Sequence, residues 1–209
     1  MSGAVWVALA LLAIGLRRLG LGYAATPFAA LARREAAFVE AAADAMFPPG
    51  GEIPESGVEA GIPGYVDRYL EALPGRQRLL IRALFLLMEQ ATLLFPAPGW
   101  GGWRRFSSLA PEQRAAALEG WRSSRLSPRR LVFLALRSLL TMGYFACPSV
   151  LRAVELAPLD IATPIVAADL LYPRAGRPKA EIVFGPGDLS DAFPGPLPAD
   201  APLHPDYRG

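Results

Sequence analysis

Histidine and cysteine, the side chains that most often supply acid–base, nucleophilic or metal-binding chemistry, occur once each in this chain of 209 residues. The histidine, His204, lies in a proline-rich stretch near the carboxyl end, and the cysteine is Cys147. A metal site needs several such ligands at set spacing. A Ser-His-Asp arrangement would have to use His204, which no predicted element holds in place. We therefore predict that this chain has no catalytic, metal-binding or cofactor-binding residue.

Other candidate groups also favour structural interpretations. Glu35, Glu40 and Asp44 fall along one predicted helix, and we interpret them as a solvated face rather than a carboxylate pair for acid–base work. Cys147 comes at a predicted helix end and is most simply a small buried apolar side chain. No glycine-rich loop follows a strand and opens a helix, as a dinucleotide site requires. The sequence therefore favours a protein that works without catalytic groups of its own.

The composition is unusually apolar for a soluble domain. Hydrophobic residues make up 53% of the chain, charged residues make up 19%, and the mean hydropathy is +0.29. An ordinary soluble domain has roughly 25% charged residues. Nearly all basic residues are arginines interleaved with acidic residues, and the formal charge is only +2, so nucleic-acid binding is not expected. The excess apolar surface needs a core, a partner or a membrane.

Residues 4–16 form an uninterrupted apolar run of about 13 residues, followed directly by Arg17 and Arg18. The run is shorter than the roughly 20 residues that cross a bilayer. It is also a poor export signal, because no positive charge except the amino terminus precedes it. We predict an apolar helix within residues 1–25 that is a short membrane anchor, a segment docked on a partner or a signal remnant.

Apolar periodicity and capping signals predict an all-α fold, an irregular bundle of about five to seven helices within residues 26–157. Thr26-Pro27 and Ser127-Pro128 each provide a capping residue followed by proline at the first helical position. We predict helices over residues 27–47, 63–73, 76–95, 111–122, 128–147 and 149–156.

The stretch 76–95 is apolar on most of its circumference, which predicts a helix buried either centrally or against a second chain. Arg82 and Glu89 lie two turns apart on it, and we interpret them as satisfied structural polar groups.

Residues 158–209 are rich in proline and glycine and are predicted to be an extended tail, with one possible strand at residues 181–184. The tail keeps apolar residues and is a candidate arm along a partner.

Several aromatic residues lie near arginines, a combination that is enriched in interface hot spots but also occurs in ordinary core packing. Both alternatives remain open from the sequence. The residues that we predict to contact a partner are Trp100, Trp103, Phe106, Trp121, Tyr144, Phe145 and Tyr172.

Four short stretches occur in a telling order: Ala-Met-Phe-Pro at 45–48, Glu-Ala-Gly at 59–61 followed by Tyr-Val-Asp at 65–67, Leu-Ala-Pro-Glu-Gln-Arg at 109–114, and Gly-Tyr-Phe at 143–145 before Pro148. In this order and spacing the chain resembles the gluconate 2-dehydrogenase subunit 3 family over roughly residues 34–150. These proteins are the small accessory subunits of membrane-associated flavin dehydrogenases.

The resemblance implies a helical, non-catalytic subunit with no cofactor of its own. It would bind a large flavin-containing subunit of the glucose–methanol–choline type, which carries FAD, and would support the folding, stability or membrane placement of that subunit. Electrons would leave the flavin for a cytochrome or quinone held elsewhere. The family implies a periplasmic location, whereas the lack of a recognisable export signal favours the cytoplasmic face of the membrane. The alternative is a membrane-attached assembly factor that binds its client transiently.

Overall fold

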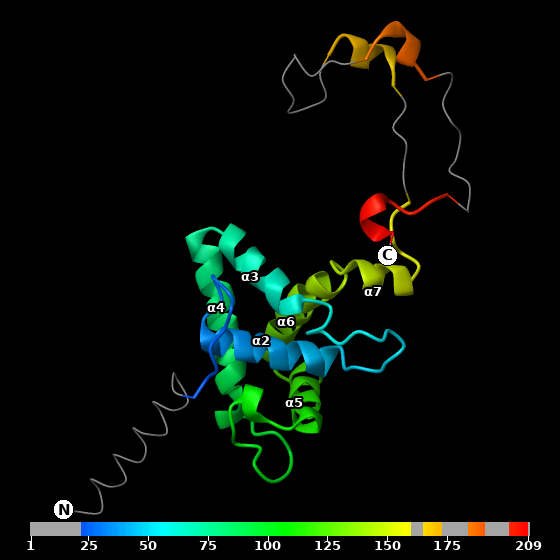
Figure 1. The fold of residues 1–209 in the computed structure, drawn as a ribbon. Coiled ribbons are helices and arrows are strands. Elements are labelled where there is room, and N and C mark those ends of the chain that lie inside the picture. Colours follow the sequence, from blue (N-terminus) through cyan, green and yellow to red (C-terminus); the bar gives the residue numbers. More distant parts are fainter. Residues whose placement is uncertain (1–21, 160–164, 173–183, 191–200, 209) are drawn as a thin grey trace, which may run out of the picture. The chain divides into compact units, whose positions relative to one another are not determined.

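The computed structural model describes residues 22–159, 165–172, 184–190 and 201–208 (Figure 1). The chain divides into two compact units, one ending at Val154 and the other beginning at Glu155. The described residues contain six α-helices and no strand, which confirms the predicted all-α class for them. The apolar run at 4–16 lies outside the described residues, as do residues 181–183 of the possible strand. The α-helices are α2 (Arg33–Met46), α3 (Ile62–Ala72), α4 (Gly75–Gln90), α5 (Pro111–Arg122), α6 (Ser127–Tyr144) and α7 (Pro148–Ala153).

Helix α2 lies at the centre of the first unit, where it contacts α3, α4 and α5 (Figure 1). Helix α6 contacts α3 and α5. The small alanine side chains of α2, Ala41 to Ala43 among them, are buried and let neighbouring helices approach closely.

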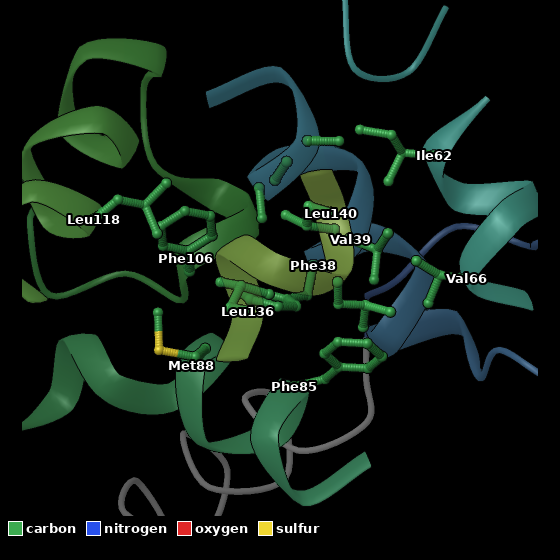
Figure 2. Packing of buried hydrophobic residues seen from close by; sticks show 14 of the residues in the cluster. Phe38, Val39, Ile62, Val66, Phe85, Met88, Phe106, Leu118, Leu136 and Leu140 are labelled. Carbon is green, nitrogen blue, oxygen red and sulfur yellow. The ribbon is translucent and has the colours of Figure 1, made fainter. Parts of the chain in front are cut away.

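The core is built on α2 from large side chains of all its neighbours (Figure 2). Phe38 of α2 is fully buried, and its ring centroid lies 5.7 Å from that of Phe85 and 5.4 Å from that of Phe106. Leu136 and Leu140 of α6 are also fully buried in this cluster. Separations of this size are favourable for aromatic pairs, so Phe38 joins α2 to α4 and to the 106–108 turn.

Helix α2 begins at Arg33, so the predicted start at Thr26-Pro27 is wrong. The cause is a contact with α3. The Asp67 carboxylate accepts hydrogen bonds from the backbone N–H groups of three consecutive residues before the helix. These bonds hold the segment away from helical pairing, because a bound N–H is not available to the preceding turn. The donors are Ala29, Ala30 and Leu31, at 3.2, 2.8 and 2.8 Å.

Glu35 is not part of a solvated face as predicted, because it is only 1% exposed. Its carboxylate accepts the Ala32 N–H at 2.9 Å and thereby caps the first turn of α2. Arg82 of α4 approaches the same carboxylate at 3.3 Å and also donates to the Ala30 carbonyl oxygen. The prediction held for Glu40, which is exposed. Arg82 pairs with Glu35, and Glu89 accepts hydrogen bonds from other residues, so both polar groups are satisfied as predicted.

The other helix boundaries lie close to the predicted ones. Helices α5 and α6 begin with proline within their first two positions, at the predicted places. Helix α4 ends at Gln90, five residues before the predicted end, and a 3-10 turn at Ala91–Leu93 follows. Gly57 lies so close to the end of α2 that a Cβ atom on it would fall 2.5 Å from the Ala43 carbonyl oxygen. Only glycine fits this approach without a shift of backbone.

The described parts of the second unit are short turns joined by a few backbone hydrogen bonds. Leu159 and Leu203 form an isolated antiparallel bridge, and the His204 N–H donates to the Pro158 carbonyl oxygen at 2.9 Å. The His204 ring accepts the Asp206 N–H at 3.4 Å and so caps a 3-10 turn. In the described parts of both units, no helix is both long and apolar enough to cross a bilayer.

Candidate functional site

A buried carboxylate organises the junction between α4 and the segment that precedes α2. Glu89 accepts the Tyr23 hydroxyl at 2.8 Å, the Ser107 hydroxyl at 2.6 Å and the Ser107 N–H at 3.0 Å. Burial raises the pKa of Glu89 and opposes the hydrogen bonds, which lower it. Burial and the Glu89 charge raise the pKa of Tyr23 to about 12. The Arg105 guanidinium lies 4.0 Å from the Tyr23 ring centroid. The three hydrogen bonds that Glu89 accepts join α4 to the segment before α2 and to the 106–108 turn, which is a structural role.

A polar depression of about 400 Å³ opens beside this junction. Glu40 and Asp44 line one side of it, and Arg105 and Arg114 also line it. Partial burial of the carboxyl and the neighbouring Asp44 raise the pKa of Glu40, although its side chain is exposed. In a Ser-His-Asp arrangement a histidine takes and returns the serine proton, and no histidine lines this depression. Among the described residues, no group of three or more histidine, cysteine, aspartate or glutamate side chains is arranged to hold a metal ion.

Cys147 is half-buried and not fully buried as predicted. Its Sγ lies 3.2 Å from the Ser149 Oγ at the start of α7. The cause is its position just beyond α6, where only one side of the residue faces the core.

The residues predicted to contact a partner separate into a buried and an exposed set. Phe106, Trp121 and Tyr144 are 5% exposed or less, so core packing accounts for them and their side chains present no surface. Trp121 packs edge-on against Phe95, with ring centroids 6.0 Å apart. Tyr144 stacks on Phe47 at 4.0 Å, and its hydroxyl donates to the Glu55 carbonyl oxygen at 2.8 Å. The exposed set consists of Trp100, Trp103, Phe145 and Tyr172.

Helix α4 is not buried around its circumference within this chain, which overturns the central-burial alternative. Only Phe85, Met88 and Glu89 of α4 are buried. Leu80 and Leu87 are 63% and 45% exposed, and Leu94, one further heptad along, is 77% exposed. Leu80 and Leu87 lie seven residues apart and so share one face of α4, and Leu94 follows the 3-10 turn after the helix. We call Leu79, Leu80, Ala83, Leu87, Leu93 and Leu94 the α4 surface.

The α4 surface departs from ordinary burial in the first unit. Single exposed leucines are common on soluble proteins, but apolar side chains grouped along one helix face mark sites of protein or membrane contact. The sequence predicted an apolar helix here, but it did not show which apolar side chains are buried and which are exposed. The periodic pattern that would separate the two faces is missing, because every position from Leu79 to Met88 except Arg82 is apolar.

Comparison with known proteins finds a family match that covers most of the helical unit. Residues 33–157 match the family model described as Gluconate 2-dehydrogenase subunit 3. No curated protein and no solved structure matches the chain. The matched stretch covers more than half of the 209 residues, begins at the first residue of α2 and extends past α7. The chain therefore belongs to the gluconate 2-dehydrogenase subunit 3 family.

Proposed function

We propose that this chain is the non-catalytic small subunit of a flavin-dependent dehydrogenase of the glucose–methanol–choline type. It binds the large subunit that carries FAD and supports the folding, stability or membrane placement of that subunit. Family membership supports the role of a dehydrogenase subunit. The finer assignment, to a flavin partner, goes beyond the family description and needs the test below.

The observation that carries the proposal is the α4 surface. Six apolar residues lie along α4 and the turn that follows it, and five of them are leucines more than two-fifths exposed. Burying a leucine side chain contributes about 1.5–3 kcal/mol relative to leaving it in water. A large subunit that covers the α4 surface would recover that free energy, which is the usual basis of a stable subunit contact.

We also propose a membrane-associated complex in which electrons pass from the flavin to a cytochrome or quinone held in another chain. The apolar run at 4–16 supports membrane contact, because its length and the two arginines after it suit an anchor at the membrane surface. The arginines favour placement of that end on the cytoplasmic side.

The test is purification of the tagged chain from its native host in mild detergent, with the visible spectrum and the protein bands read together. Leu87→Ser and the matched control Leu156→Ser, at another exposed leucine, are purified in parallel. We expect flavin absorption and one larger chain in equal amount with the unaltered protein and with the control. Leu87 is 45% exposed, so a covering subunit removes about half of its surface from water. We expect Leu87→Ser to weaken the contact by about 1 kcal/mol, roughly fivefold in Kd, and to lower the flavin recovered per chain. A colourless chain, alone or with chaperones, would contradict the subunit assignment and favour a transient assembly factor.

A further inference from the structure

Helix α6 carries two apolar faces, of which the core uses one. Leu136, Leu139 and Leu140 face the core and are buried. The opposite face bears Leu131, Leu134, Met142 and Phe145, each more than a third exposed. At 100° per residue these four, with Ala135 and Ser138, fall within about 100° of one another around the helix axis. We call Leu131, Leu134, Ala135, Ser138, Met142 and Phe145 the α6 stripe.

A groove runs beside the α6 stripe. It has a volume of about 440 Å³ and is bounded by the end of α2, by α5 and by α6. Phe145 belongs to both the stripe and the groove, so the two surfaces are continuous. A hole of this size admits one or two large side chains, which a flat lipid surface does not supply. Other residues that line the groove are Met46, Phe47, Glu119, Arg122, Phe133 and Arg137.

The segment that contains α5 to α7 is basic, and the charged residues that line the groove itself are Glu119, Arg122 and Arg137. Residues 111–154 contain seven arginines and two glutamates, a formal charge of +5, whereas the whole chain carries +2. Helix α6 has three arginines and no acidic residue. Arg122 is paired with Glu119, at 2.6 Å. Arg137 lines the groove and, within the part of the chain that the structure describes, makes no hydrogen bond or ion pair.

We propose that the α6 stripe and its groove bind an amphipathic helix of the large dehydrogenase subunit. That helix places apolar side chains at intervals of three and four residues on the stripe and inserts one into the groove, with an aspartate or glutamate beside it that pairs with Arg137. The inference rests on the proposed function, because it names a second surface, besides the α4 surface, through which this subunit holds the same partner. Arg137, unpaired among the described residues, sets the sign of the partner's charge at the groove, and the apolar α6 stripe suits the apolar face of an amphipathic helix.

The first test places a photo-crosslinking amino acid, p-benzoylphenylalanine, at Phe145 in the full chain in its native host, with the same substitution at exposed Arg33 as control. After irradiation, the crosslinked peptide is identified by mass spectrometry. We expect a large-subunit peptide that carries apolar residues at helical spacing and at least one carboxylate. A crosslink to a second copy of this chain, to lipid or to a peptide without acidic residues overturns the inference.

The second test reverses one charge. Arg137→Glu and the control Arg33→Glu change the net charge equally, and both residues are exposed. We expect Arg137→Glu to lower the flavin recovered per chain about tenfold, Arg33→Glu to leave it unchanged, and Arg137→Lys to retain most of it. Added salt should reduce the recovery for the unaltered chain more than for Arg137→Glu. Equal flavin recovery with Arg137→Glu and Arg33→Glu overturns the inference.

The two proposals fail in distinguishable ways. If the unaltered chain brings no flavoprotein, the proposed function fails and this inference falls with it. If the unaltered chain brings the flavoprotein and Arg137→Glu does so equally, only the groove assignment fails. Flotation of the purified chain with vesicles of phosphatidylglycerol and phosphatidylcholine tests a lipid occupant. Flotation that Arg137→Glu abolishes while flavin recovery persists identifies lipid and overturns the inference.

Discussion

The start of helix α2 depends on one side chain from another helix, Asp67 of α3. Its carboxylate accepts three consecutive backbone N–H groups at 2.8 to 3.2 Å and so ends the preceding segment where the helix begins. Asp67→Ala removes all three acceptor contacts and fills no new space. Asp67→Asn keeps the shape with one acceptor oxygen. We expect Ala to destabilise the first unit and Asn to lie between Ala and the unaltered chain.

The size of the effect follows from the exposure of the site. A buried hydrogen bond to a charged group contributes about 1.5–3 kcal/mol. Asp67 is half-exposed, so water reaches the freed N–H groups, and about 0.5–1 kcal/mol per bond is a better scale. The free energy of unfolding should therefore fall by about 2 kcal/mol with Asp67→Ala. For a unit of this size that corresponds to a Tm lowered by about 4–8 °C.

The same contact predicts a pH dependence. Burial raises the pKa of the Asp67 carboxyl, but the three backbone N–H groups and Arg68 outweigh it and hold the pKa below its usual value. A carboxyl with a lowered folded-state pKa contributes stability above its unfolded pKa of about 3.9 and loses it as the pH falls through the folded value. The difference between the unaltered chain and Asp67→Ala should therefore be full at pH 7 and shrink well below pH 4.

The assay is urea unfolding of the full chain followed by far-ultraviolet circular dichroism, at neutral pH and at about pH 3. Comparing the two proteins at each pH cancels the titration of the other carboxylates. A free energy of unfolding for Asp67→Ala within about 0.5 kcal/mol of that of the unaltered chain would refute this explanation of the α2 start. A difference in that free energy that grows as the pH falls would refute it too.

Two further substitutions test the packing by the same unfolding assay. Gly57→Ala places a methyl group 2.5 Å from the Ala43 carbonyl oxygen, so we expect a loss of roughly 1–3 kcal/mol; unchanged stability would mean that this approach is looser than described. Phe38→Ala empties the centre of the core, where the side chain is 0% exposed, and should cost roughly 3–5 kcal/mol. A loss below about 1 kcal/mol would show that α2 is not the central element.

The helix starts that local chemistry determines were predictable from the sequence. Ala110-Pro111 and Ser127-Pro128 open α5 and α6 where expected, because proline within the first turn loses no hydrogen bond and has a preset φ. Thr26-Pro27 carries the same signal and opens no helix. There the competing contact comes from Asp67, some 36 to 38 residues away in the chain, and no local pattern reveals it.

The division of apolar residues between core and surface was less predictable. Both faces of α6 are apolar, so the sequence alone does not show which one is buried. In α4 a nearly continuous apolar run hides the periodicity on which such predictions depend. The same limit applied to the aromatic residues. Phe106 and Trp103 lie three residues apart in one arginine-containing loop, yet one is buried and the other is exposed. Local composition was alike, and tertiary packing decided the difference.

The central claim is that this chain binds a flavoprotein and does not itself carry the flavin. Native mass spectrometry of the detergent-purified assembly tests it most directly. We predict one species whose mass is the sum of this 22.4 kDa chain, one larger chain and one FAD. When the assembly is separated in the gas phase, the flavin should leave with the larger chain. A free 22.4 kDa chain with no partner, or this chain retaining the flavin, would contradict the account.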